Sequence, residues 1–269
     1  MKPDGSYESL DGSAQLLVAL EQGDRITSLR TDGREWLLPD LSLPASHYPV
    51  TFIRPGFGGW DECIPTVAAC VHNGAELADH GDAWQLPWTP TSPSSARVDL
   101  ASVPLRFSRT IHSTQSGFRF AYSVSNLTSE PQEFLWSAHP QFKGRDITVD
   151  FGPAALNWSD EAGNPEEWNP TEPFRETEQG TGRKLYLDSP SLVSRATLRH
   201  ASSGSNLELA WSVPELGIWI DHCAFAREPV IAVEPCTSRG DALTTAQHPV
   251  VLGPSQTLSW DLSVTNLRD

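Results

Sequence analysis

The sequence predicts an all-β protein with only a few short helical turns. Short runs enriched in β-branched and aromatic residues recur along the chain, separated by many of its 19 Gly and 22 Pro. No segment shows sustained helical periodicity. With 269 residues and a hydrophobic content of 38%, the chain can bury a sizeable core. Because no low-complexity linker or internal repeat interrupts it, we expect one large domain over residues 1–269.

The predicted strands follow one another between turn signals. The first two form a hairpin around the turn Glu21–Asp24, and a third short strand passes through Trp36–Leu38. Two long segments, residues 39–91 and 150–181, are predicted loops, which in a compact domain are usually functional. The predicted strands are residues 15–20, 25–30, 36–38, 96–100, 105–113, 118–126, 133–139, 196–200, 207–212, 217–223, 229–234 and 257–264.

The charge of the chain argues against nucleic-acid and membrane partners. Asp and Glu number 34 against 19 Lys and Arg, which gives a net charge of -15 and a pI near 4.8. Such a charge repels phosphate backbones and anionic headgroups. The longest apolar runs are too short to span a bilayer, and the polar residues 1–7 predict no secretory signal.

The cysteines indicate a reducing compartment. The chain has four, without a C-x-x-C pair and without zinc-ligand spacing. We therefore expect reduced, mostly buried thiols in a cytoplasmic protein, and no metal site. The four residues are Cys63, Cys70, Cys223 and Cys236.

The densest set of candidate binding residues lies in the first long loop. Its glycines let a backbone approach a ligand, its carboxylates accept hydrogen bonds from hydroxyl groups, and its indoles offer flat apolar faces. The set suits a neutral sugar, although a Gly-rich turn with solvated acids and packed indoles has the same residue types. The candidates are Arg54, Trp60, Asp61, Glu62, His80, Asp82, Trp84 and Trp88.

A candidate catalytic histidine ends the predicted strand 133–139. Period-two alternation places His139 on a polar face with Ser137 and Gln141, opposite Trp136. A histidine at a strand end is well placed at the rim of a cleft, although a single histidine is more often structural.

A carboxylate follows the apolar run 229–233. If Glu234 is buried it must find partners or raise its pKa, whereas a strand-terminal glutamate can also emerge into solvent before Pro235. We expect partial desolvation to raise the pKa of Glu234 and to strengthen it as a base. In the following loop, Arg239 could pair with this carboxylate or with a ligand.

Four separated segments, taken in order, resemble the aldose 1-epimerase (galactose mutarotase-like) family. The N-terminal hairpin and a closing Leu252–Pro254 are also similar, so the resemblance covers nearly the whole chain. Each motif is weak alone, and their common order makes them more specific. The segments are Gly58–Glu62 with Pro65–Thr66, His80–Gly81 with Trp84 and Pro87–Trp88, Trp136 with His139–Pro140 and Phe142, and Ala232–Pro235 with Asp241–Ala242.

The resemblance implies a large antiparallel β-sandwich, the galactose mutarotase-like supersandwich, with a sugar cleft on one concave sheet. It implies that His139 is the general acid and Glu234 the general base, and that His80 aids sugar binding or ring-oxygen polarisation. The chain departs from the family's Asn-Arg pair, offering only Arg54, and from its His-Tyr-Phe signature. No residue clearly matches the aspartate with which these enzymes hold sugar hydroxyls.

The expected function is that of an aldose 1-epimerase, which interconverts the α and β anomers of a sugar by acid–base catalysis. Such a reaction needs one acid and one base and no cofactor or metal. We expect a small-molecule sugar substrate, a monomer or homodimer, and one cleft that contains His80, His139 and Glu234. Trp60, Trp84 and Trp88 are expected to frame this cleft and to pack against the C–H face of the sugar.

Alternatives of other classes stay open at this point. A non-catalytic carbohydrate-binding sandwich would keep the Trp-rich loops and could lose the acid–base pair. An epimerase for a phosphorylated or sulfonated sugar should gather cations at the cleft, which are sparse here, although Arg239 near Glu234 leaves an anionic sugar possible. A cupin-like metal enzyme ranks last, because the chain has no H-x-H motif.

Overall fold

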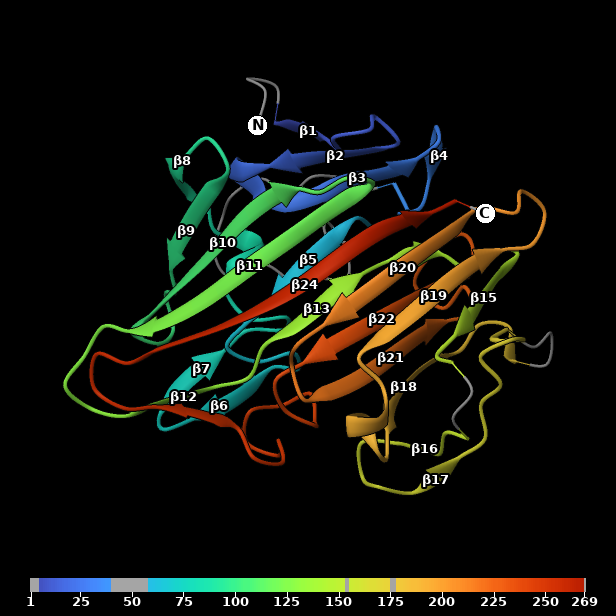
Figure 1. The fold of residues 1–269 in the computed structure, drawn as a ribbon. Coiled ribbons are helices and arrows are strands. Elements are labelled where there is room, and N and C mark those ends of the chain that lie inside the picture. Colours follow the sequence, from blue (N-terminus) through green and yellow to red (C-terminus); the bar gives the residue numbers. More distant parts are fainter. Residues whose placement is uncertain (1–4, 40–57, 153–154, 175–177, 269) are drawn as a thin grey trace.

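The computed structural model describes residues 5–39, 58–152, 155–174 and 178–268, and it is built almost entirely of strands (Figure 1). The described helices are three single 3-10 turns, η1 (Leu20–Gln22), η2 (Ala83–Gln85) and η4 (Pro190–Leu192). The prediction of an all-β protein with few short helices is therefore confirmed. All pairs of described strands are antiparallel.

The larger of the two main sheets has twelve strands. They are β1 (Ser6–Glu8), β2 (Ala14–Ala19), β3 (Arg25–Thr31), β4 (Arg34–Glu35), β5 (Trp60–Cys63), β13 (Ser137–Pro140), β14 (Phe142–Lys143), β16 (Trp158–Ser159), β17 (Pro165–Glu166), β18 (Gly182–Leu187), β21 (Glu215–Asp221) and β22 (Val230–Cys236). Their order is β1-β2-β3-β5-β13-β22-β21-β18-β16-β17, with β4 on β3 and β14 on β22. Three strands that are far apart in the chain, β5, β13 and β22, thus lie side by side at the centre of this sheet.

The smaller main sheet has eight strands, and two hairpins complete the described elements. Its strands are β8 (Thr89–Ser92), β9 (Ser95–Asp99), β10 (Leu105–Ser113), β11 (Gly117–Asn126), β15 (Ile147–Asp150), β19 (Arg195–His200), β20 (Asn206–Trp211) and β24 (Thr257–Leu267). Their order is β15-β19-β20-β24-β11-β10-β9-β8. The hairpins pair β6 (Cys70–His72) with β7 (Ala75–Leu77), and β12 (Gln132–Phe134) with β23 (Val250–Leu252).

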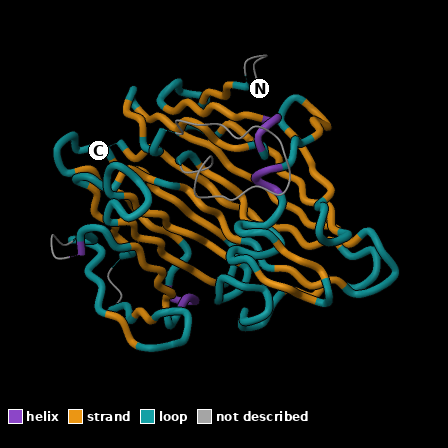
Figure 2. The backbone as a smooth tube through the Cα atoms, turned by 180° about the vertical axis from the view of Figure 1, so that it is seen from behind, coloured by secondary structure: helices purple, strands orange, loops and turns teal. Residues whose placement is uncertain are grey.

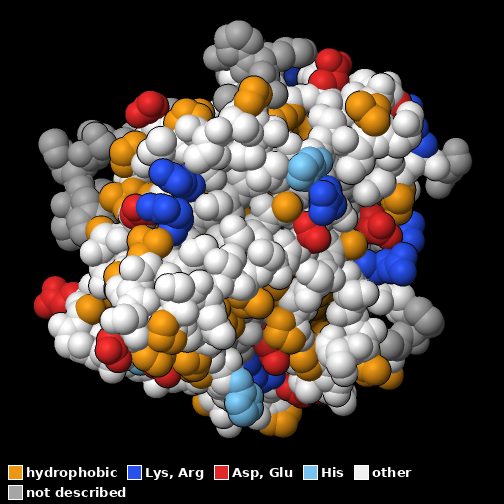
Figure 3. Space-filling model, turned by 60° about the vertical axis from the view of Figure 1, so that its left-hand side comes forward, with side chains coloured by type: hydrophobic (Ala, Val, Ile, Leu, Met, Phe, Trp, Pro, Cys, Tyr) orange, Lys and Arg blue, Asp and Glu red, His pale blue; other side chains and the backbone are white. Residues whose placement is uncertain are grey.

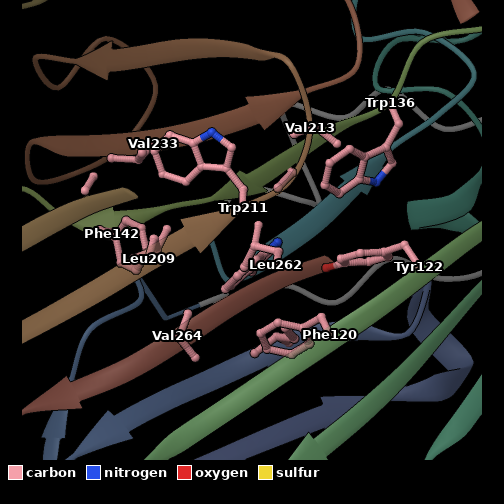
Figure 4. Packing of buried hydrophobic residues seen from close by; sticks show 14 of the residues in the cluster. Phe120, Tyr122, Trp136, Phe142, Leu209, Trp211, Val213, Val233, Leu262 and Val264 are labelled. Atoms are coloured by element: carbon pink, nitrogen blue, oxygen red, sulfur yellow. The ribbon is translucent and has the colours of Figure 1, made fainter. Parts of the chain in front are cut away.

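The hydrophobic core lies between the two main sheets. Figure 1 shows the smaller sheet in front of the larger one, and Figure 2 shows the same two layers from behind. Alternate residues of each strand point inward, so that Phe120 and Tyr122 on β11 lie beside Leu262 and Val264 on β24 (Figure 4). On β22 the inward residues include Val233. The other face of the larger sheet is left for polar side chains.

Some predicted boundaries are wrong. The strand predicted over 133–139 is broken into β12 and β13, because Leu135 and Trp136 bond to loops instead of to a strand. The Trp136 backbone exchanges hydrogen bonds with Thr237, through N–H to Oγ1 at 2.9 Å and through its carbonyl oxygen to N–H at 2.9 Å. The segment predicted as the loop 39–91 contains β5, β6, β7, η2 and β8 in its described part.

The surface shows mixed charge. On the face drawn in Figure 3, Lys and Arg side chains lie in small groups near Asp and Glu side chains. Among the described residues, no helix has the length and apolar character that crossing a bilayer requires. The four cysteines form no disulfide, as expected.

Candidate active site

The register of the larger sheet aligns one row of residues across its centre. His139 on β13 lies opposite Asp61 on β5, and Glu234 on β22 lies opposite Gly217 on β21, which in turn lies opposite Tyr186 on β18. Residues opposite each other on paired strands share one face of a sheet. Since the flanking residues of these strands point into the core, this row belongs to the outer face of the larger sheet.

His139 and Glu234 form a buried pair in the middle of this row. The Nδ1 atom of His139 is 2.6 Å from Oε1 of Glu234, and the two side chains are 6% and 2% exposed. The two residues are 95 positions apart in the chain and meet only because β13 and β22 are neighbours. The pair is therefore a direct hydrogen bond between a histidine and a carboxylate.

His80 joins this pair from a loop. Its ring centroid is 5.1 Å from that of His139, and its Nδ1 is 3.1 Å from Oδ1 of Asp79. Gly81 fixes the loop against the chain at Ile64, where a Cβ atom on Gly81 would lie 2.1 Å from the Ile64 carbonyl oxygen. With a φ of +69° and this close approach, position 81 requires glycine. The structure thus brings together His80, His139 and Glu234.

These residues line a cavity of about 200 Å³. This volume is many times what a single water molecule needs and suits a ligand with a single ring. One wall is aromatic, because Trp219 and Phe225 lie with ring centroids 5.9 Å apart. The remaining described lining consists of Val67, Ala68, Asp79, Lys184 and Asp241.

The aromatic wall is held by a turn after β21. The carboxylate of Asp221 accepts hydrogen bonds from the backbone N–H groups of Ala224 and Ala226, both at 2.8 Å. This turn places Phe225 at the cavity with 45% of its surface exposed. An exposed aromatic ring beside a polar cavity is suited to the C–H face of a sugar.

The electrostatics of Glu234 differ from the expectation. Burial alone would raise the pKa of Glu234, but the charges of Lys184 and His139 and the hydrogen bonds that both donate lower it to about 2. The Lys184 ammonium contacts Oε2 of Glu234 and lies 3.3 Å from Oδ1 of Asp241. The prediction of a raised pKa was wrong because the interactions of Glu234 with Lys184 and His139 outweigh desolvation. Glu234 is therefore an anion over the whole physiological pH range.

The pKa of the second histidine, His80, is shifted toward its neutral form. Burial lowers the pKa of His80, and the charge of His139 lowers it further, against the opposing hydrogen bond and charge of Asp79. Burial raises the pKa of Asp79, but its interactions with His80 bring the net value below the ordinary one. The neutral form of His80 is thus favoured, which leaves it suited to hydrogen bonding with a sugar.

The three indoles expected at the cleft lie in the interior instead. Trp60 and Trp84 are 0% exposed and Trp88 is 3% exposed. Trp60 points into the core on β5 and contacts Phe120, with ring centroids 5.2 Å apart. The prediction that these residues frame the cleft is wrong, because burying such large apolar rings stabilises the fold more than leaving them at a rim. The cavity takes its aromatic wall from a different strand and loop.

The two acids next to Trp60 are buried on opposite faces of β5, and neither lines the cavity. Arg25 binds the carboxylate of Asp61 through two hydrogen bonds, of 2.6 Å and 2.8 Å, and both side chains are buried. Glu62 points between the sheets, where it accepts hydrogen bonds from Arg109, Tyr122 and Trp136 at 2.8, 2.9 and 2.9 Å. Glu62 therefore cannot reach a ligand in the cavity, and its predicted binding role is wrong.

Asp82 and Arg239 support loops. The Asp82 carboxylate accepts two hydrogen bonds from Ser102, from N–H and from Oγ, each of 2.8 Å, and it does not line the cavity. Arg239 does not pair with Glu234: its guanidinium lies 5.2 Å from the ring centroid of Tyr186 and donates to Ser159. The predicted contacts of Asp82 and Arg239 with a ligand are therefore wrong, because neither residue lines the cavity. Arg54 lies outside the described residues.

Five polar or aromatic cavity residues were not among the predicted site residues. Lys184 and Tyr186 alternate on β18, a strand that the prediction did not include although Leu185 and Leu187 mark its inner face. The phenol of Tyr186 donates a 2.7 Å hydrogen bond to Asp241, which orients that carboxylate. The alternating pattern of 182–187 could have revealed this strand. The residues missed are Asp79, Lys184, Trp219, Phe225 and Asp241.

Within the described residues, no group of three or more His, Cys, Asp or Glu side chains is arranged to hold a metal ion. A carboxylate, an imidazole hydrogen-bonded to it and a second imidazole face one small cavity, as acid–base chemistry requires.

No protein-family model and no curated protein sequence matches the chain. Solved structures do share its fold. A galactose mutarotase-like protein from Lactobacillus casei ATCC 334 aligns with a TM-score of 0.72 at 18% identity, over 98% of this chain and 100% of that chain. A galactose mutarotase related enzyme from Lactobacillus acidophilus aligns with a TM-score of 0.71 at 14% identity, over 98% and 97%.

A candidate aldose 1-epimerase from Escherichia coli K12 aligns with a TM-score of 0.70 at 17% identity, over 97% of this chain and 98% of that chain. Identities this low establish the fold alone. The chain therefore has the antiparallel sandwich of galactose mutarotase-like proteins, as the resemblance in sequence implied.

Proposed function

We propose that the protein interconverts the α and β anomers of an aldose, as an aldose 1-epimerase does. The observation that carries the proposal is the pair of His139 and Glu234, 2.6 Å apart, in a cavity that His80 also lines. The fold shared with proteins named galactose mutarotase-like supports it. An acid and a base that face one ring-sized cavity are the minimum machinery for this reaction.

Glu234 acts as the base and His139 as the acid. The carboxylate takes the proton of the anomeric hydroxyl while the imidazolium gives its proton to the ring oxygen, so that the C1–O5 bond breaks and a C1 carbonyl forms. Rotation about C1–C2 turns the carbonyl, and the reverse transfers close the ring and restore both residues. Although Glu234 already accepts from His139 and Lys184, its two oxygens together offer about four acceptor positions, so it can also accept from the sugar.

A neutral aldose fits the described lining better than an anionic one. Lys184 is the one Lys or Arg among the described lining residues, and it already contacts Glu234 and Asp241. A phosphate or sulfonate group would enter next to three carboxylates. Trp219 and Phe225 offer the apolar wall for the ring, and Asp241 can accept hydrogen bonds from hydroxyl groups.

The test is NMR exchange spectroscopy on a panel of aldoses, with phosphorylated and sulfonated ones included. On the sugar that the wild type accelerates, Glu234→Gln and His139→Asn should each lower exchange by roughly two or more decades, because each removes one proton-transfer group. Glu76→Gln and His112→Asn are matched controls at exposed positions and should retain wild-type exchange. Circular dichroism verifies folding, and folded E234Q and H139N with undiminished turnover would refute the assigned roles.

A non-catalytic sugar-binding protein is the second candidate. It is favoured by the low pKa of Glu234, because a base works best with a pKa near the working pH. The same samples separate the two candidates. Saturable binding of a neutral aldose without accelerated exchange by the wild type would establish the binding protein, and accelerated exchange would establish the enzyme.

A further inference from the structure

Lys184 reaches the acid–base pair from the second strand beyond Glu234. Its ammonium contacts Oε2 of Glu234, while His139 occupies Oε1, so that each carboxylate oxygen has a cationic or potentially cationic partner. Asp241 lies on the other side of the ammonium at 3.3 Å. The Lys184 side chain is 11% exposed, and it would not be held there without its two carboxylate partners.

The space for this contact comes from Gly217. Between Lys184 on β18 and Glu234 on β22 lies β21, and Gly217 is paired with Glu234 on one side and Tyr186 on the other. A Cβ atom at position 217 would lie 2.8 Å from Cε and 3.3 Å from Nζ of Lys184. The lysine therefore passes over the glycine to reach Glu234, and a side chain there would displace it.

We propose that Lys184 is a positioning residue, which holds Glu234 as an oriented carboxylate beside His139, and that Gly217 provides the space for it. The proposal rests on the proposed function of the cavity and adds a residue that the acid–base scheme does not itself require. A lysine held by two carboxylates fixes the rotamer of Glu234 before a sugar binds.

The effect of Lys184 on the pKa of Glu234 can be separated from the effects of the other neighbouring groups. With Lys184 in place, the effect of burial is overcome and the pKa of Glu234 is about 2. Without Lys184, burial and the neighbouring acids would raise this pKa, and only His139 would lower it. The pKa of Glu234 should then rise to about 4 or above. The titratable and charged groups that face Glu234 from the packed elements are Asp61 and Cys63 on β5, Asp79 and His80 in the loop before η2, His139 on β13, Lys184 and Tyr186 on β18, Glu215 on β21, and Cys236 and Asp241 on and after β22.

The direct experiment titrates Glu234 by carboxyl ¹³C NMR, with Glu234→Gln to assign the signal. Lys184→Met should move the midpoint up by two or more pH units, and Lys184→Arg, which keeps the charge, should restore most of the low value. Gly217→Ala keeps every charged group and has an ordinary backbone conformation, yet it should move the midpoint in the same direction by less. Lys143→Met, outside the cavity, should leave it unchanged.

The pH profile of exchange then tests the role in catalysis. The ratio of kcat/KM of K184M to that of the wild type should fall about tenfold for each pH unit below the new midpoint, whereas a purely structural defect would lower it equally at all pH values. An unchanged Glu234 midpoint in folded K184M and G217A would overturn the proposal even if the wild type is an epimerase. A raised midpoint in a protein that accelerates no sugar would support the positioning of Glu234 by Lys184 and refute the proposed function.

Discussion

Glu234 and Glu62 are both about 1% exposed, yet burial has opposite outcomes on the two faces of the larger sheet. At the cavity, Lys184 and His139 lower the pKa of Glu234 to about 2. Between the sheets, burial dominates and raises the pKa of Glu62 from 4.5 to about 7, although Arg109, Tyr122 and Trp136 act against it.

The two pKa values differ because Glu62 and Glu234 have different hydrogen-bond and ion-pair partners. Arg109 also binds Asp24, through its backbone carbonyl and through a 2.8 Å ion pair, so its charge is shared between two acids, and the other donors to Glu62 are neutral. Glu234 instead has the ammonium of Lys184 and the imidazole of His139. Burial alone therefore does not set the protonation of a carboxylate, and the partners on the cavity face keep Glu234 charged.

The largest effect on stability is expected from breaking the cluster between the sheets. Arg109→Met removes the only partner cation that the described structure gives to both Asp24 and Glu62, and should lower the free energy of unfolding by about 3–5 kcal/mol. Urea denaturation at pH 7 measures the change. Arg106→Met, on the same strand with a partly exposed ion pair to Asp99, is the control and should cost about 1 kcal/mol or less. Equal losses in the two variants would contradict the comparison.

A pH dependence of stability should separate the two carboxylates. Because the folded pKa of Glu62 is raised, its contribution is fully present below about pH 4.5 and is lost as the pH rises through about 7, by roughly 3 kcal/mol. The contribution of Glu234 is present above about pH 4.5 and is lost as the pH falls toward about 2.

Denaturation of the wild type and of Glu62→Gln at pH 4.5 and 8 measures how much Glu62 contributes to the free energy of unfolding at each pH. The stability of the wild type relative to E62Q should fall between these pH values, since glutamine does not titrate. A constant difference would show that Glu62 keeps an ordinary pKa in the folded protein. Glu234→Gln should show no such fall in this range.

The smallest expected effect comes from the aromatic wall. Phe225→Ala should raise KM for the accepted sugar by about 2–10-fold, because a ring contact contributes about 0.5–1.5 kcal/mol, and should change stability little at this exposed position. Trp88→Ala is the contrasting variant and should lower the free energy of unfolding by about 3–5 kcal/mol, because that indole is buried. An unchanged KM in F225A would remove Phe225 from the site.

Local sequence pattern predicted much of the fold. The strands at 105–113 and 118–126 appear as β10 and β11 nearly residue for residue, because alternating apolar residues mark them clearly. The break between β12 and β13 could not be predicted, since it depends on Thr237, about a hundred residues away. The strand Trp60–Cys63 could not be predicted either, because acidic residues point to both faces of β5 and the sequence shows no apolar alternation.

Sequence pattern was enough to predict an all-β chain, because strand periodicity is a local property. The ordered motifs that resemble a known family were enough to predict that His80, His139 and Glu234 share one cleft. Tertiary structure decided which faces these strands bury. It sent Trp60 and Glu62 inward, brought Lys184 across Gly217 to Glu234, and placed Trp219 and Phe225 at the cavity. Such pairings depend on strand order and register, and strands that are neighbours in the sheet can be far apart in the chain. The charge of Glu234 follows from the same contacts, so it could only be known once they were formed.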